Sequence, residues 1–247
     1  MIRTAVFCFA LSCSVLAQTG HTPAVNNPPN GVSIPNIIQS FAAKEKEFKQ
    51  ALEQYTYTQD VIVRSSCQGA QTGVYHLNVN VGFDGKGNRV DEVKAVDSTL
   101  QCIQITKEDL DTLRNQSLYV LTTDEIQDYQ INFVGQQKQD DLNFYVFDVL
   151  PAAALAGKQY FEGRIWVDGR DFLIVKTHGT IATKREKKRK AQENLFPVVT
   201  TWREQIDGRY WFPTQSLAKD VLHFSPGDVQ IDEVVKLTAY KAVVHSK

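Results

Sequence analysis

Histidines are the side chains of this 247-residue chain best suited to bind a metal ion or to move a proton near neutral pH. A zinc site needs histidine or cysteine ligands at short, characteristic spacings. None of the five histidines has such a neighbour, and the first and last lie near the chain ends. We therefore expect no metal site and interpret these side chains as solvated or hydrogen-bonded. They are His21, His76, His178, His223 and His245.

The usual motifs for covalent catalysis and phosphate binding are absent: the sequence has no G-x-S-x-G, no P-loop and no dinucleotide fingerprint. The nearest glycine cluster, at residues 85–87, has no helix after it, so these glycines indicate a turn. We expect no cofactor and no enzymatic activity. An enzyme built on this chain would need convergent polar groups, for which Asp60, Arg64 and His76 are the candidates.

A run of basic residues, KREKKRK, extends from Lys184 to Lys190. Such a run can attract an anionic membrane surface. It is also short enough to be a solvated loop between two hairpins, and we favour that interpretation. Both interpretations stay open.

The composition is that of one globular domain, with 43% hydrophobic and 22% charged residues. The formal net charge of −1 argues against broad nucleic-acid binding. We divide the chain into a signal peptide at residues 1–17, a flexible leader at residues 18–32 and a single domain at residues 33–247. We expect the domain to be a monomer.

The signal peptide is predicted from three features. Arg3 supplies the positive charge, the apolar run after it is too short to span a bilayer, and V-L-A before Gln18 is a small-residue cleavage site. We therefore expect export to the periplasm. The alternative is a lipid anchor on Cys13, although the residues before it match a lipobox poorly.

Cleavage would leave two cysteines, Cys67 and Cys102. Two cysteines in an exported domain are most simply a disulfide. They follow the ends of the first and third predicted strands, which lie at the same edge of an antiparallel meander. The alternative is a pair of unrelated buried thiols.

Residues 160–213 contain two hairpin signals in series. Asp168-Gly169 and Asp207-Gly208 each join two runs rich in aromatic and β-branched residues, and Asp-Gly in that setting is a strong hairpin signal. They predict four consecutive antiparallel strands. We expect a polar loop at residues 136–143 between two earlier strands.

Helix signals come before and between the strands. An apolar stripe at helical spacing begins after Ser33, with residues 44–47 (KEKE) as its predicted solvent side. The stripe consists of Ile34, Ile38, Phe41, Phe48, Leu52 and Tyr55. Thr106 and Thr122 each begin a short helix with a capping-box pattern.

Residues 74–84 show the clearest period-two alternation of the chain, with one apolar and one polar face. In all, the sequence predicts about ten antiparallel strands, one long helix and two short helices, without βαβ alternation. The fold class is therefore mainly β, with helices covering the open face of the sheet.

Three segments together resemble the outer-membrane lipoprotein-sorting family, which is LolA-like. They are RIWVD-x-x-D-x-x-IVK from residue 164, WREQIDGRYWFPTQ from residue 202 and IDEVVKLTAYK from residue 231. The earlier order of signal peptide, amphipathic helix, three strands and short helices is similar too, so the resemblance covers about residues 36–244.

The resemblance implies an unclosed antiparallel β-barrel whose helices form a lid over an apolar cavity. Its partners would be lipoprotein acyl chains or lipids, with transient contacts to membranes or envelope proteins and none to nucleic acid. The family's functional arginine has Arg64 as its nearest candidate here. An envelope sensor or scaffold that binds another protein without lipid is the alternative. From strand alternation we predict as cavity lining Leu77, Val79, Val81, Phe147, Ile165 and Val167.

Overall fold

The computed structural model describes residues 31–67, 70–115, 121–139, 142–153, 159–183, 197–224 and 227–243. The predicted signal peptide, Cys13, most of the leader, the basic run from Lys184 to Lys190, and His21 and His245 lie outside these ranges.

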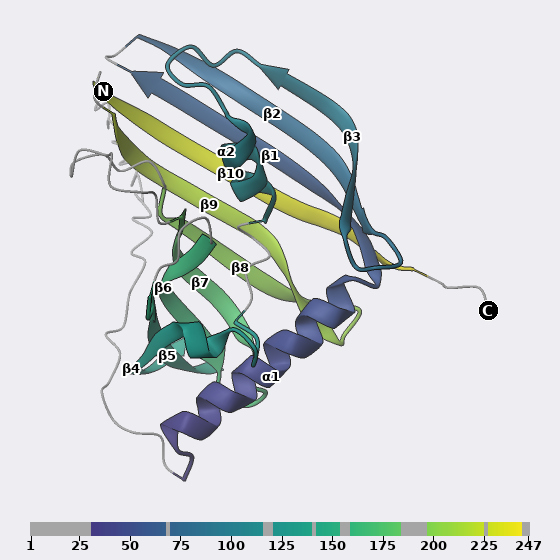
Figure 1. Ribbon diagram of the computed structural model, residues 1–247, viewed down its shortest axis with the longest axis vertical. Helices are drawn as coiled ribbons and strands as arrows, with labels where there is room; N and C mark the ends of the chain where they lie inside the picture. Colours follow the sequence, from purple (N-terminus) through teal and green to yellow (C-terminus); the bar gives the residue numbers. More distant parts are fainter. Residues whose placement is uncertain are drawn as a thin grey trace, which may run out of the picture.

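Ten antiparallel strands form one sheet in the order β3-β2-β1-β10-β9-β8-β7-β6-β5-β4 (Figure 1). The strands at the two ends of this order, β3 and β4, are not paired with each other, so the sheet is an open half-barrel and the predicted fold class is confirmed. The strands are β1 (Tyr55–Cys67), β2 (Ala70–Phe83), β3 (Arg89–Ser98), β4 (Tyr129–Gln139), β5 (Leu142–Pro151), β6 (Gln159–Asp168), β7 (Ile174–Thr183), β8 (Val199–Ile206), β9 (Tyr210–Phe224) and β10 (Gly227–Ala242).

Both predicted Asp-Gly hairpins are present. Asp207 and Gly208 have φ values of 53° and 66°, the left-handed conformation that a tight hairpin turn requires. The Asp168 carboxylate accepts hydrogen bonds from the backbone N–H groups of Arg170 and Asp171, which stabilises the first turn. Local turn chemistry therefore accounts for the pairing of β6 with β7 and of β8 with β9.

Two predicted boundaries were wrong. The polar segment at residues 136–143 is mostly strand, because β4 and β5 continue their pairing as far as Gln139 and Leu142. The four strands predicted from the two hairpin signals were placed within residues 160–213, but the last of them, β9, continues through Pro213 to Phe224. A register shift between Trp202 and Arg203 on the neighbouring strand accommodates this stretch.

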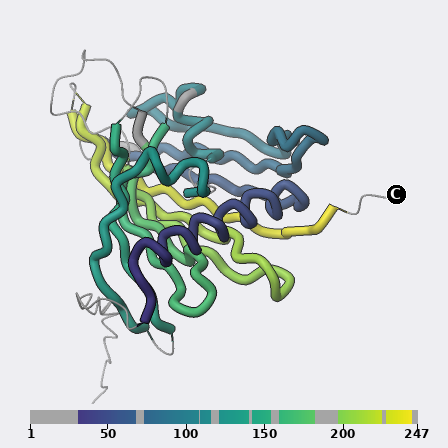
Figure 2. Tube along the Cα trace, turned by 60° about the horizontal axis from the view of Figure 1, so that its bottom comes forward, coloured from purple at the N-terminus to yellow at the C-terminus, as the bar shows by residue number. Residues whose placement is uncertain are grey.

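Helix α1 (Ile34–Leu52) begins at Ser33, whose side chain caps it by accepting a hydrogen bond from the Asn36 backbone N–H. It crosses the concave side of the sheet, and the strands curve around it (Figures 1 and 2). We call this concave side the inner face. The buried residues of α1 are Ile37, Phe41, Ala42, Glu45, Phe48, Ala51 and Leu52.

The predicted apolar stripe is thus correct in outline but shifted at its start, because Ile37 is fully buried whereas Ile34 and Ile38 are partly exposed. The predicted solvent side was wrong at Glu45, which is fully buried. This position lies four residues after Phe41 and three before Phe48, on the buried side of the helix.

Two shorter helical segments lie against the same face. Helix α2 (Lys107–Asn115) lies in front of β1 and β10 (Figure 1), and the 3₁₀ helix η2 (Ile126–Asp128) precedes β4. The predicted cap at Thr106 is formed in both directions: the Asp109 carboxylate accepts from the Thr106 backbone N–H at 2.9 Å, and the Thr106 hydroxyl accepts from the Asp109 backbone N–H at 3.2 Å. At Thr122 the Glu125 carboxylate accepts from the Thr122 backbone N–H at 3.1 Å, but the helix itself begins only at Ile126.

The predicted disulfide is present. Cys67 at the end of β1 and Cys102, after β3, are bonded with their Cα atoms 6.0 Å apart. The bond anchors the segment that leads from β3 into α2. No helix within the described ranges is both long and apolar enough to cross a membrane.

Candidate functional site

The inner face is apolar because alternate residues of each strand point towards α1. Its buried side chains form two clusters, one under each half of α1. The cluster under the N-terminal half includes Ile37 and Phe41, and the cluster under the C-terminal half includes Phe48 and Leu52.

The six residues predicted to line a cavity all belong to these two clusters. Each is at most 2% exposed. Leu77, Val79 and Val81 of β2 pack in the cluster with Phe48, whereas Phe147 of β5 and Ile165 and Val167 of β6 pack in the cluster with Phe41. Among them, Phe147 contacts helix α1 directly through the ring of Phe41, with the ring centres 5.7 Å apart. The role of the six residues as ligand contacts stays a prediction.

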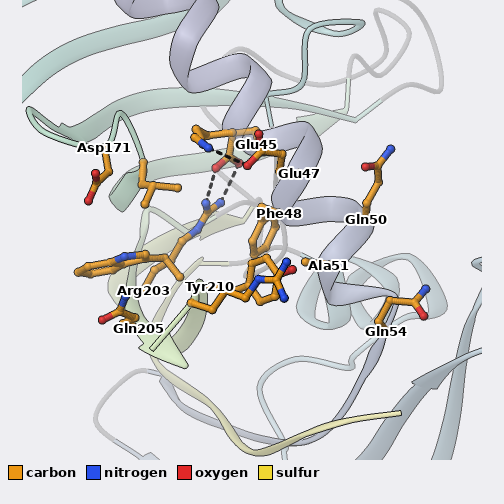
Figure 3. A pocket seen from close by; sticks show the side chains of 14 residues that line it. Glu45, Glu47, Phe48, Gln50, Ala51, Gln54, Asp171, Arg203, Gln205 and Tyr210 are labelled. Carbon is orange, nitrogen blue, oxygen red and sulfur yellow. Dashed lines mark hydrogen bonds and ion pairs between the residues drawn. The ribbon is translucent and has the colours of Figure 1, made fainter. Parts of the chain in front are cut away.

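A buried ion pair joins α1 to the sheet within this apolar layer. Both terminal nitrogens of Arg203 on β8 donate to the Glu45 carboxylate, one of them at 3.0 Å, and both side chains are at most 3% exposed. The Arg203 guanidinium also lies 4.4 Å from the centre of the Phe48 ring. Figure 3 shows it pointing from the sheet to the Glu45 carboxylate.

Glu45 also connects α1 to the segment that leads into η2. Its carboxylate accepts a hydrogen bond from the Leu121 backbone N–H. Burial raises the pKa of the Glu45 carboxyl above its ordinary value of 4.5, and the charge of Arg203 opposes this shift. The next residue of α1, Lys46, forms an exposed ion pair with Asp124 at 3.1 Å.

A pocket of about 580 Å³ opens beside the ion pair (Figure 3). Its walls come from α1, from the turn between β6 and β7 and from the hairpin between β8 and β9. Its lining combines charged side chains with amide and aromatic ones. The amide and aromatic side chains are Phe48, Gln50, Gln54, Gln205, Tyr210 and Trp211.

A second polar group lies in the inner face on β1 and β3. The fully buried Gln59 side chain donates to the backbone carbonyls of Leu113 and Arg114 at 3.2 and 3.3 Å, at the C-terminus of α2. Arg89 donates to the Arg114 carbonyl at 2.7 Å and to the Gln59 amide oxygen. Asp91 accepts from Arg89 at 2.7 Å.

The residues considered for an enzyme lie on the other face of the sheet. Asp60 accepts from Asn78 at 2.9 Å and is 2.8 Å from a His76 ring nitrogen. Burial alone would raise the pKa of Asp60, but hydrogen bonds from Asn78 and His76 lower it below its ordinary value of 3.8. Arg64 is exposed on this outer face, away from the inner one. The described part of the chain places no three His, Cys, Asp or Glu residues where they could hold a metal ion.

Sequence reasoning missed the polar residues of the inner face. A signal existed for Glu45, because its position falls within the buried stripe of α1. A signal existed for Arg203 and Gln59 as well, since each occupies a buried position of a strand with alternating burial.

No family model matches this sequence, and no curated protein matches it. Several solved structures are similar to the chain. A LolA superfamily protein from Nitrosomonas europaea is 14% identical, with a TM-score of 0.39 over 85% of this chain and 94% of that chain. A DUF1329 family protein from Desulfovibrio piger is 12% identical, with a TM-score of 0.42 over 85% and 95%.

A putative outer membrane lipoprotein-sorting protein domain from Vibrio parahaemolyticus is 12% identical, with a TM-score of 0.38 over 83% of this chain and 94% of that chain. Likenesses at these identities and TM-scores carry no inference about function. The function is therefore inferred from this chain's own residues.

Proposed function

We propose that this chain is an exported periplasmic protein that binds the acyl chains of lipids or lipoproteins in the apolar interior of its half-barrel. Helix α1 is the lid of that interior. The proposed activity is binding and release, without a cofactor and without catalytic turnover.

The main support for the proposal is that a helix covers the apolar inner face of the open sheet. A ten-stranded sheet with an apolar inner face is covered by the side chains of a helix instead of being closed by strand pairing. A helix can move away as a unit, whereas a paired strand cannot leave without breaking a ladder of hydrogen bonds. Movement of α1 would expose apolar side chains of both clusters.

The apolar side chains of α1 and a bound acyl chain would gain similar free energies from burial in the interior. Full burial of a large apolar side chain contributes about 1.5–3 kcal/mol, so Ile37, Phe41, Phe48 and Leu52 together contribute roughly 6–12 kcal/mol. An acyl chain that buries about 14 methylenes would contribute roughly 11 kcal/mol. A bound acyl chain can therefore replace the contacts of α1, and α1 can cover the interior again after release.

The ion pair between Glu45 and Arg203 is better explained if α1 is a movable lid than if α1 is a static part of the core. A buried pair adds little net stability, because desolvation of two charges offsets their attraction. It does fix one position of α1 on an apolar surface that would tolerate sliding. We infer that it sets the closed position of the lid.

The first test is native mass spectrometry of the protein purified from the periplasm, with lipid extraction of the same sample. Stoichiometric acyl lipid is the expected result. An empty protein that also fails to take up a fluorescent fatty acid would contradict the proposal. A protein partner that co-purifies without lipid would favour the sensor or scaffold instead.

Matched substitutions locate the binding surface. Val79 on the inner face and Val234 on the outer face of the sheet are each replaced by threonine, which has nearly the same shape. Because an unpaired hydroxyl in an apolar site costs about 1–3 kcal/mol, Val79→Thr should weaken fatty-acid binding roughly 5-fold or more. Val234→Thr should leave the affinity unchanged.

A further inference from the structure

Hydrogen-bond donors are built into an otherwise apolar part of the inner face. Gln59 lies on β1 opposite Val79 of β2 and Leu237 of β10, and all three side chains are at most 1% exposed. A buried amide in such surroundings is costly unless its polar atoms are paired. Its partners therefore show what this position is built to bind.

The partners of these donors are carbonyl oxygens. The Gln59 amide and one terminal nitrogen of Arg89 both donate to the last carbonyls of α2, at residues Leu113 and Arg114. Helix α2 has only nine residues and is largely polar. Its contacts with the core are made by Leu110 and Leu113.

A third donor in the same place is not used. Tyr57 is 2% exposed, and within the described ranges its hydroxyl has no hydrogen-bond partner. It lies opposite Val81, which in turn lies opposite Asp91, so it is two strands away from the Arg89–Asp91 pair. A phenol is protonated at physiological pH, and burial raises the pKa of Tyr57 further, to about 12, so its hydroxyl is available as a donor.

We propose that Tyr57, Gln59 and Arg89 form a recognition site for the ester carbonyls of a glycerolipid. In the unliganded protein the carbonyls at the C-terminus of α2 occupy the Gln59 and Arg89 donors, and the Tyr57 donor is unused among the described residues. This inference rests on the proposed function and adds a chemical specificity to it. The ligand and α2 compete for the same donors, so ligand binding releases this end of α2.

The charges nearby favour a neutral acceptor over a phosphate or carboxylate. Arg89 is paired with Asp91 at 2.7 Å, and Arg114 lies 3.1 Å from Asp91 and 4.0 Å from Asp111. Two arginines are therefore balanced by two aspartates. An ester carbonyl accepts hydrogen bonds without carrying a charge that Asp91 would repel.

The experiment compares two lipids that differ only in their carbonyl groups. A short-chain diacylglycerol and the dialkyl ether of the same chain length each displace a fluorescent fatty acid from the full protein. One hydrogen bond is worth roughly 2- to 12-fold in affinity, so the ester should bind the wild-type protein several-fold more tightly than the ether. Tyr57→Phe and Gln59→Leu should each reduce this ratio, with little change in the ether's affinity.

Tyr57→Phe is the sharpest variant, because the hydroxyl that it removes has no hydrogen bond to lose within the described part of the unliganded protein. The matched control is Tyr240→Phe. The Tyr240 ring lies 5.1 Å from that of Tyr57, but its hydroxyl donates to the Pro213 carbonyl at 2.6 Å. This control should keep the wild-type ratio of ester to ether affinity.

The outcomes separate this inference from the proposed function. Equal binding of ester and ether by the wild-type protein, or an unchanged ratio in Tyr57→Phe, would overturn the carbonyl site and leave acyl binding intact. Failure of the fluorescent fatty acid and both lipids to bind would overturn both. A synthetic diacylglyceryl lipopeptide and a phosphatidylglycerol, measured in parallel, distinguish the two natural sources of such esters.

Discussion

Glu45 and Arg203 are 158 residues apart in the chain, yet they form a two-pronged ion pair inside the molecule. The pair is the one place among the described residues where opposite charges, each at most 3% exposed, join α1 to the sheet. Replacing one residue of the pair should change the free energy of unfolding differently from replacing both.

Arg203→Met should lower the free energy of unfolding by about 3–5 kcal/mol, because Glu45 is then left buried without its counter-ion. The double variant Glu45→Met/Arg203→Met should recover most of this loss, since it leaves no uncompensated charge. Urea denaturation of the two variants and the wild type measures both effects. A single variant that costs less than about 1 kcal/mol would show that the pair is already hydrated.

Tyr57 should make the protein sensitive to alkaline pH. Burial raises its pKa from 10 to about 12 in the folded state, so between these values the unfolded chain has lost a proton that the folded protein keeps. Stability is therefore fully present below pH 10 and falls as the pH rises to about 12. The loss from this group is roughly 2–3 kcal/mol.

Tyr57→Phe lacks this contribution. Because Tyr57→Phe removes a buried hydroxyl that has no hydrogen-bond partner among the described residues, the variant should be more stable than the wild type by about 1–3 kcal/mol at neutral pH. This difference should grow above pH 10. Chemical denaturation at a series of pH values tests this. A difference that stays constant with pH would mean that Tyr57 ionises as it does in the unfolded chain.

The disulfide between Cys67 and Cys102 closes a loop of 35 residues. The loop-entropy estimate for that length is roughly 4 kcal/mol, so Cys67→Ala/Cys102→Ala should lower the free energy of unfolding by about 2–4 kcal/mol. Reductant should lower the stability of the wild type by a similar amount and leave the double variant unaffected. A wild-type protein whose free energy of unfolding is the same with and without reductant, after the unfolded chain has been exposed to the reductant, would contradict the bond.

Gly163 and Gly179 should resist substitution because β6 and β7 approach closely where they pair. A Cβ atom on Gly163 would lie 2.3 Å from the His178 carbonyl oxygen and 2.4 Å from the Gly179 Cα atom. Gly163→Ala should therefore cost about 1–3 kcal/mol or more. The control is Gly85→Ala, where nothing lies within 4 Å and the expected change is within about 0.5 kcal/mol. Thermal unfolding of both variants gives the comparison.

Features of the fold that depend on neighbouring residues could be predicted from the sequence. The Asp207-Gly208 turn needs a left-handed backbone and has the residues that adopt it. The caps at Thr106 and Thr122 involve residues three positions apart. The pairing of Cys67 with Cys102 could be predicted because signal-peptide cleavage would leave only these two cysteines and both follow strands that end on the same side of the meander.

The polar residues of the inner face could not be predicted in the same way. A glutamate in a helix or a glutamine in a strand is exposed in most proteins, and burial becomes favourable only when a distant partner is present. Glu45 depends on Arg203 of β8, and Gln59 depends on the end of α2. Period-two alternation identified the apolar members of the face, such as Val79, but not the donors among them.

The central position of β1 has a consequence for the order of folding. The strand pairs with β2 on one side and with β10 on the other, so Tyr55 near the start of the domain lies opposite Ala242 near its end. The two parts of the sheet, β3-β2-β1 and β10 to β4, can join only after the last strand has been made. Contacts of such high sequence separation form slowly. The complete sheet thus cannot form until the C-terminal strand is available, which is compatible with the export proposed above.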